Sequence, residues 1–158
     1  MLKQLLIPTA IFAVCAAGFA AAQNAPPPAA LSADQYVQAR QASYDLSAAA
    51  MAEMRQAVKT GLPVKKQAYP AAALGRWARI LPALFPAGTG PGSTTVTTHA
   101  KPEIWSQRAG FEKAAADYAA AADKLRDLAQ ADDAAGFAAQ LEVVDKACDT
   151  CHDTYKAK

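Results

Sequence analysis

Near its C-terminal end the chain carries the run Cys148-Asp149-Thr150-Cys151-His152. Cys-x-x-Cys-His is the attachment signature of a c-type haem, in which two thiols form thioethers with the haem vinyl groups and the adjacent imidazole binds the iron. On a helix the three side chains lie at positions i, i+3 and i+4, so they project from one face and can hold one macrocycle. The run therefore predicts one covalent haem c per chain, attached through Cys148 and Cys151, with His152 as the axial iron ligand.

Other uses of paired cysteines fit this run less well. A thioredoxin-like redox pair would follow a strand of a βαβ unit, whereas this run ends an alanine-rich helical pattern. A structural zinc site needs four ligands, and outside the run the chain offers only Cys15 and His99 as sulfur or imidazole donors. A disulfide across so short a spacing would close a very small loop and add little stability.

The first 22 residues predict a secretory signal peptide cleaved after Ala22. Lys3 is their only charged residue, an apolar stretch follows, and a run of alanines stands where a signal peptidase needs small residues. The apolar stretch is short for a membrane span. We therefore expect export to the periplasm, with no membrane anchor in the mature chain and with Cys15 removed together with the signal.

The rest of the chain predicts a short leader and one all-α domain. Residues 23–31 contain three consecutive prolines and are expected to form a flexible leader. Within 32–158, apolar residues recur at helical spacing over four segments, at 33–59, about 67–84, about 102–128 and about 132–155. Four helices with mostly short connections favour an antiparallel four-helix bundle with the haem among facing helices.

Local signals mark where the first helix begins and ends. Ser32 followed three residues later by Gln35 forms a capping-box pattern, and Gly61 and Pro63 stop the helix. The longest connection, 85–100, is rich in Gly, Pro and Thr and is predicted to be a loop. His99 lies in this loop, and nothing in the sequence around it indicates a function.

The charge balance excludes some partners. The chain has 16 basic and 14 acidic residues, and its Lys and Arg residues do not cluster along one segment. Nucleic-acid binding needs such a cluster on one face, so no nucleic-acid partner is expected. After residue 22 no second apolar run is long enough to cross a bilayer.

The order of several short motifs resembles the class II c-type cytochromes, specifically the cytochrome c′ family. The haem motif lies on the last helix, whereas ordinary soluble cytochromes c carry it near the start of the chain. The other similar segments are Arg40-Gln41, the loop 86–90, the run 101–106 (Lys-Pro-Glu-Ile-Trp-Ser), and His152-Asp153-x-Tyr155. The resemblance covers about 33–158.

The resemblance implies a periplasmic haem protein with five-coordinate iron and an apolar pocket on the face opposite the histidine. His152 would be the only protein ligand. Aligned on Arg40-Gln41, Tyr44 occupies the position of the bulky residue above the iron, or of the methionine that completes a six-coordinate iron in low-spin members. Arg40, with its neighbour Gln41, would approach a haem propionate, and Lys156 would lie close to the histidine-bound face.

Two alternatives for the sixth position stay open. Met51 and Met54 lie on the same predicted helix and would ligate the iron if the alignment were out of register, although packing is the commoner role of a helical methionine. Tyr44 would ligate only as a tyrosinate, as in catalase. Trp77 and Trp105 are expected to pack the bundle or the edge of the haem.

The favoured function is reversible binding of nitric oxide or other diatomic gases such as carbon monoxide, for nitric oxide sequestration. The alternative is periplasmic electron transfer through a six-coordinate haem, with redox partners. The first helix lacks the distal His and Arg pair of a peroxidase, so no enzymatic activity is expected. The resemblance also implies a homodimer through the first two helices, to which Val37, Leu46 and 48–50 are expected to contribute.

Overall fold

The computed structural model describes residues 30–158, of which Leu31–Lys158 form one compact unit. The predicted signal peptide, its cleavage site and nearly all of the leader lie outside the described residues. The unit contains the helices α2 (Ala33–Thr60), α3 (Ala68–Ile80), α4 (Glu103–Ser106), α5 (Arg108–Gln130) and α6 (Ala134–Tyr155), and the short 3-10 helices η1 (Val64–Gln67) and η2 (Leu81–Leu84). No described helix combines the length and the apolar character needed to cross a membrane.

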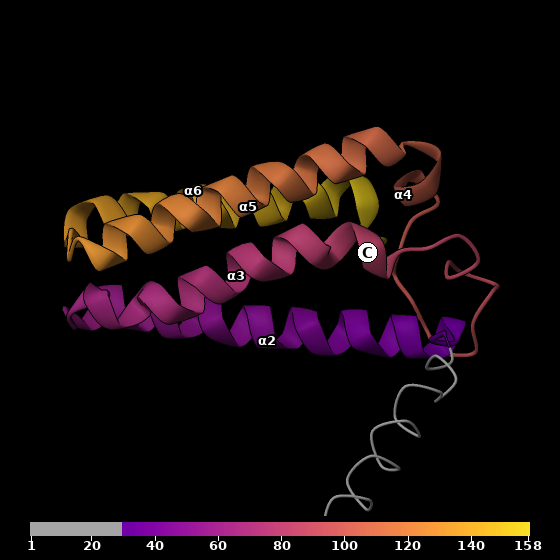
Figure 1. Cartoon of the computed structure of the whole chain (residues 1–158), viewed down its shortest axis with the longest axis horizontal. Helices are drawn as coiled ribbons and strands as arrows, with labels where there is room; N and C mark the ends of the chain where they lie inside the picture. Colours follow the sequence, from indigo (N-terminus) through magenta and orange to yellow (C-terminus); the bar gives the residue numbers. More distant parts are fainter. Residues whose placement is uncertain (1–29) are drawn as a thin grey trace, which may run out of the picture. The chain divides into compact units, whose positions relative to one another are not determined.

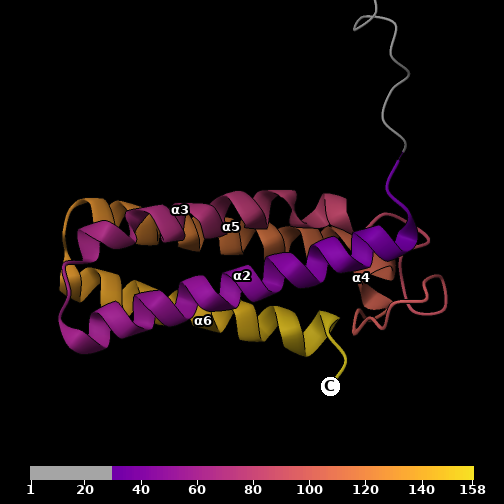
Figure 2. The ribbon, with the colours of Figure 1, turned by 90° about the horizontal axis from the view of Figure 1, so that it is seen from below.

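Four long helices run antiparallel to their neighbours in chain order. Figure 1 shows α3 beside α2, and Figure 2, the view from below, shows α3 and α5 on one side of the bundle and α2 crossing over α6 on the other. α3 and α5 pack along most of their length, as do α5 and α6, whereas α2 packs less extensively against α3 and α6. The predicted all-α antiparallel four-helix bundle is therefore confirmed, and α2 is its most loosely packed member.

The ends of α2 follow the sequence signals. The hydroxyl of Ser32 accepts a hydrogen bond from the backbone N–H of Gln35 at 3.2 Å, and the Gln35 side chain accepts one from the Ser32 N–H at 2.8 Å. At the other end Gly61 adopts φ 65°, a left-handed conformation that favours glycine, and its N–H meets the carbonyls of Ala57 and Val58. Both ends thus satisfy backbone groups that the helix itself leaves unpaired.

Two predicted helices are less regular than their periodicity suggests. The pattern over 67–84 becomes the α-helix α3 followed by the 3-10 helix η2, and Pro70 lies in the first turn of α3 as expected. The pattern after Pro102 breaks at Gln107, which adopts φ −115° and ψ 43°. Arg108 follows the break, and its guanidinium donates to the carbonyls of Pro82 and Phe85 at 2.8 and 3.1 Å.

Two clusters of buried side chains form the core. One cluster surrounds Met54, Phe137 and Leu125, each fully buried. The second cluster lies at the end of the bundle that carries the haem motif and includes Trp77, Phe85, Phe111 and Tyr155. Here Gly110 lets α5 approach the end of α6 closely, because a Cβ at this position would lie 2.7 Å from the Tyr155 hydroxyl.

The long loop 85–102 is attached to the start of α2 through Asp34. This carboxylate accepts hydrogen bonds from the N–H and the hydroxyl of Thr95 at 2.8 and 2.5 Å, and from the hydroxyl of Thr94. The bonds from Thr94 and then Thr95 lower the pKa of Asp34 to about 2. The anionic form of Asp34 therefore stabilises the folded loop.

We expect Asp34→Asn to lower the urea midpoint at pH 7 and to lose this effect in acid. The folded pKa of Asp34, about 2, lies below the ordinary aspartate value of about 4. Its contribution is therefore complete above the ordinary value and disappears as pH falls through the folded pKa. Urea unfolding of the holoprotein between pH 7 and pH 2.5 measures this, with Glu53→Gln, at an exposed position of the same helix, as control. A difference between Asp34→Asn and the parent that stays constant over this range would contradict the prediction.

Candidate haem site

A cavity of about 610 Å³ lies between α2 and α6 and is lined by residues from every long helix and from the loop before α4. This volume is within the range of cofactor pockets in proteins. Its inner wall consists largely of apolar and aromatic side chains from the second core cluster. They include Trp77, Leu81, Phe85, Phe111 and Tyr118.

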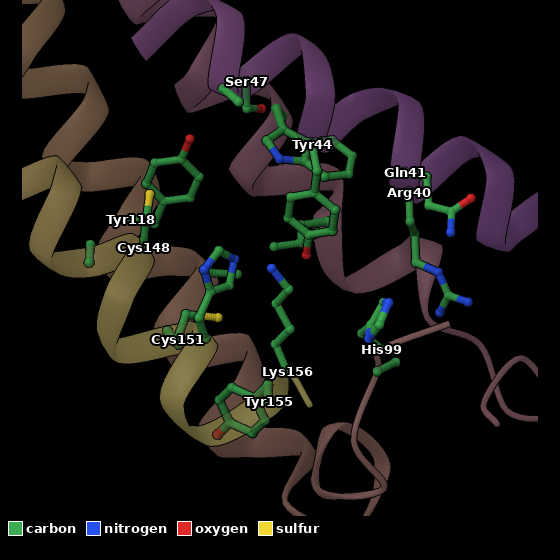
Figure 3. Close-up of a pocket in the computed structure, with 18 of the residues that line it drawn as sticks. Arg40, Gln41, Tyr44, Ser47, His99, Tyr118, Cys148, Cys151, Tyr155 and Lys156 are labelled. Carbon is green, nitrogen blue, oxygen red and sulfur yellow. The ribbon is translucent and has the colours of Figure 1, made fainter. Parts of the chain in front are cut away.

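The three residues of the haem motif lie together on the cavity side of α6. Cys148, Cys151 and His152 all line the cavity, as the helical spacing predicted. Figure 3 shows Cys148 and Cys151 on this helix. Burial raises the pKa of Cys148 to about 11 and also raises the pKa of Cys151. Such thiols stay protonated at neutral pH, unlike the reactive thiolate of a thioredoxin-like pair, whose pKa is lowered. The thiol environment thus opposes the redox-pair alternative.

Tyr44 lies on the opposite wall and faces His152. The two ring centroids are 6.3 Å apart, and the Tyr44 ring also meets Trp77 edge-on, with centroids 5.5 Å apart and planes at 88°. Figure 3 shows the phenol of Tyr44 projecting from α2 into the cavity. Burial raises the pKa of Tyr44, so the phenol is neutral at physiological pH and the tyrosinate alternative is disfavoured.

The two methionines of α2 occupy different surroundings. Met54 is fully buried in the first core cluster and does not line the cavity. Met51 belongs to the same cluster, is 4% exposed, and reaches the cavity two helical turns from Tyr44. Tyr44, rather than a methionine, is therefore the α2 residue that stands against His152.

Arg40, Gln41 and Lys156 also line the cavity. Arg40 is 3% exposed, and its guanidinium lies 4.2 Å above the Phe85 ring and donates to the Thr89 carbonyl at 2.7 Å. Gln41 donates its side-chain amide to the Thr97 carbonyl at 2.9 Å, so this amide holds the loop. Burial lowers the pKa of Arg40, and the nearby charge of Lys156 adds to burial in lowering the pKa of His152.

Sequence reasoning missed several residues of the site. His99, to which we assigned no function, lines the cavity, and so does Tyr118 of α5. Thr89, the partner of Arg40, was not singled out either. No local signal marks these residues, because the loop and α5 reach the cavity only through the fold. Trp77 and Trp105 pack as predicted, the latter also donating its indole N–H to the Pro86 carbonyl at 3.0 Å.

The arrangement fits a covalently bound haem. Two thiols and an imidazole share one helix face, and that face borders a mostly apolar cavity with an aromatic side chain opposite the imidazole. The buried guanidinium of Arg40 lines the same cavity, and it takes part in none of the ion pairs of the described residues. Such a group can bind an acidic substituent of the haem. The fold and the site together define a c-type haem protein built on a four-helix bundle.

Comparison with known proteins identifies the particular family. The family model described as Cytochrome C' matches residues 35–156. The cytochrome c′ of Pararhodospirillum photometricum is 32% identical over 126 residues, which is 79% of this chain and 98% of that protein. A shorter match, 44% identical, spans 39% of this chain and 47% of the cytochrome c′ of Rubrivivax gelatinosus. The chain belongs to the cytochrome c′ family, and it carries covalently bound haem c.

Solved structures agree with this family. A cytochrome c′ described as having an unusual ligand-controlled dimer dissociation superposes with a TM-score of 0.77 at 26% identity, covering 82% of this chain and all of that one. A ferrous variant of cytochrome c prime from Alcaligenes xylosoxidans with bound NO superposes with a TM-score of 0.71 at 28% identity, covering 82% of this chain and 99% of that one.

Proposed function

We propose that this protein is a periplasmic haem protein that reversibly binds nitric oxide at a five-coordinate iron held by His152, in order to sequester the gas. The observation that carries the proposal is the position of Tyr44, whose ring faces His152 across the cavity at 6.3 Å. A neutral phenol opposite His152 would not supply the thioether that closes the sixth position of a bound haem iron. A similar protein has been characterised with bound NO.

The chain's own residues give the cavity its selectivity. Haem iron supplies the binding of small diatomic gases, and the polarity and access of the surrounding pocket decide which of them enter. Leu81, Phe85 and Phe111 line the inner wall and exclude water and charged ligands from it. Tyr44 fills the space opposite His152, and its edge-on contact with Trp77 favours this position. An incoming gas must therefore displace the Tyr44 ring.

The optical spectrum of the holoprotein tests this proposal. We expect high-spin bands in both oxidation states, and spectral changes when the ferrous protein is titrated with nitric oxide and then, separately, with carbon monoxide. Low-spin bands without any response to either gas would contradict the proposal. That outcome would mean that a side chain occupies the sixth position, and it would support the electron-transfer alternative with periplasmic redox partners. Turnover of peroxide by the holoprotein would contradict our view that it is not an enzyme.

We also propose a homodimer that forms through the outer face of α2. Leu46 is 72% exposed, and Ala49 is exposed as well. The structure corrects part of our expectation. Val37 is 1% exposed, both Val37 and Ala48 line the cavity, and Ala50 packs against the first core cluster. A similar cytochrome c′ is described as having an unusual ligand-controlled dimer dissociation.

Leu46→Glu is expected to shift the protein toward monomer by at least about tenfold in dissociation constant, because an interface that buries this side chain would also bury an unpaired carboxylate. Analytical ultracentrifugation of the purified holoprotein over a concentration series measures the effect. Gln38→Glu, an exposed position near the start of α2, controls for added charge. A parent protein that is monomeric at all concentrations would overturn the proposal.

A further inference from the structure

The loop residues 97–101, which we call the strap, connect the two helices that form the cavity walls. On the α2 side Gln41 donates to the Thr97 carbonyl at 2.9 Å. On the α6 side the N–H of Ala157 donates to the His99 carbonyl at 2.7 Å, and the N–H of Lys101 donates to the Tyr155 carbonyl at 3.0 Å. The middle residue of the strap is thus fixed from both sides.

His99 occupies this middle position and lines the cavity. Arg40 and Lys156 line it too, and Figure 3 shows the three side chains toward the same end of the cavity. The ion pairs of the described residues include none of these three side chains. Three nitrogen-bearing groups from α2, the strap and the residue after α6 therefore line one end of the cavity.

Other charged or titratable groups line the same cavity. From α2 they are Tyr44, Asp45 and Arg55, and from α5 Tyr118; from α6 they are Asp145, Cys148, Asp149, Cys151, His152 and Tyr155. Asp145 is occupied by the guanidinium of Arg55. Arg40, by contrast, is buried with only the neutral Thr89 as hydrogen-bond acceptor. A buried cation without an anion is costly, so this end of the cavity suits a carboxylate.

We propose that the imidazole of His99 is a titratable partner of a haem propionate and that its charge tunes the reduction potential of the haem. The inference rests on the covalent haem and not on gas binding. Imidazole changes its charge between about pH 5 and 8, and the sequence holds only two histidines, of which His152 is assigned to the iron. His99 is therefore the one imidazole left to respond to pH beside the haem.

The direction of the effect follows from charge. Reduction adds one electron to the haem and so lowers its positive charge. A protonated His99, having taken a proton from the solvent, favours the reduced form by electrostatic attraction. The reduction potential is therefore expected to rise as pH falls through the range in which His99 gains its proton, and reduction in turn strengthens proton binding at His99.

Spectroelectrochemical titration of the holoprotein from pH 5.5 to pH 8.5, with the electrode supplying the electron, tests the proposal. At pH 5.5 we expect the equilibrium constant for haem reduction to be about three- to tenfold larger in the parent than in His99→Gln. A tenfold difference corresponds to a reduction potential that is higher by about 59 mV for one electron. At pH 8.5 the two potentials are expected to coincide. Thr97→Val, a neutral change in the same strap that keeps the carbonyl bound by Gln41, should follow the parent.

Potentials of the parent and His99→Gln that agree at every pH would overturn the proposal, as would a difference of the opposite sign. If a haem propionate alone caused the pH dependence, the reduction potential of His99→Gln would change with pH as that of the parent does, and the proposal would be wrong. If His99→Gln fails to fold with haem, the NMR titration of the parent decides: the midpoint of the His99 imidazole resonances should lie higher in the ferrous than in the ferric protein. Equal midpoints would exclude any coupling between this imidazole and the haem.

Discussion

Tyr44→Ala is expected to accelerate the association of carbon monoxide with the ferrous protein by about tenfold or more. In the parent an incoming gas must move a ring that packs edge-on against Trp77 at 5.5 Å and faces His152. Such an aromatic contact contributes about 0.5–1.5 kcal/mol beyond its buried area. Removal of a barrier of about 1.4 kcal/mol accelerates a step tenfold. Flash photolysis or stopped-flow mixing of the ferrous holoprotein measures the rate.

Two further variants separate this explanation from a general loosening of α2. Tyr36→Ala removes a partly buried tyrosine from the same helix that does not line the cavity, so it should leave the rate unchanged. Tyr44→Met places a thioether opposite His152, and we expect low-spin bands and slower gas binding, since methionine and histidine are the axial pair of cytochromes c. An unchanged rate in Tyr44→Ala would show that gas reaches the iron by a route that Tyr44 does not obstruct.

The fold was predictable where the signals are local. The capping box at Ser32, the stop at Gly61 and the place of Pro70 in the first turn of α3 all depend on neighbouring residues alone, and the structure shows each of them. The break at Gln107 was missed because it lies within a helical pattern that carries no glycine or proline there. Contacts between Arg108 and the end of η2 accompany this break, and periodicity does not reveal contacts between distant segments.

The site was predictable to the extent that a helix arranges it. Cys148, Cys151 and His152 share a face because of their spacing, and Tyr44 follows Arg40 by one turn on the other wall. His99 was not identified as part of the site, because its position depends on hydrogen bonds between the strap and residues more than fifty positions away in the sequence. The sequence also did not reveal which of the proposed dimer residues are exposed. Leu46 lies on the outer face of the bundle and Val37 is buried inside it, a difference that depends on how the helices pack.

The double variant Cys148→Ala/Cys151→Ala is expected to purify without covalent haem and with a thermal midpoint more than about 10 °C below that of the holoprotein. Without the haem the apolar lining of a cavity of about 610 Å³ loses the surface that covers it. A domain of this size is stable by only about 5–15 kcal/mol in total. Without the haem the cavity must therefore fill with water or collapse, and α2, the helix with the least extensive packing, is expected to loosen first.

Three measurements on the double variant check this expectation. Haem remaining after acid–acetone extraction reports the covalent bond, circular dichroism reports the thermal midpoint, and hydrogen exchange reports which helix opens. Thr150→Ala, at an exposed position between the two cysteines, should keep both the haem and the midpoint. A double variant as stable as the holoprotein would show that the bundle closes on its own. In that case the haem would contribute to ligand binding and not to the stability of the bundle. Faster hydrogen exchange confined to α2 would instead show that the haem holds α2 against α6.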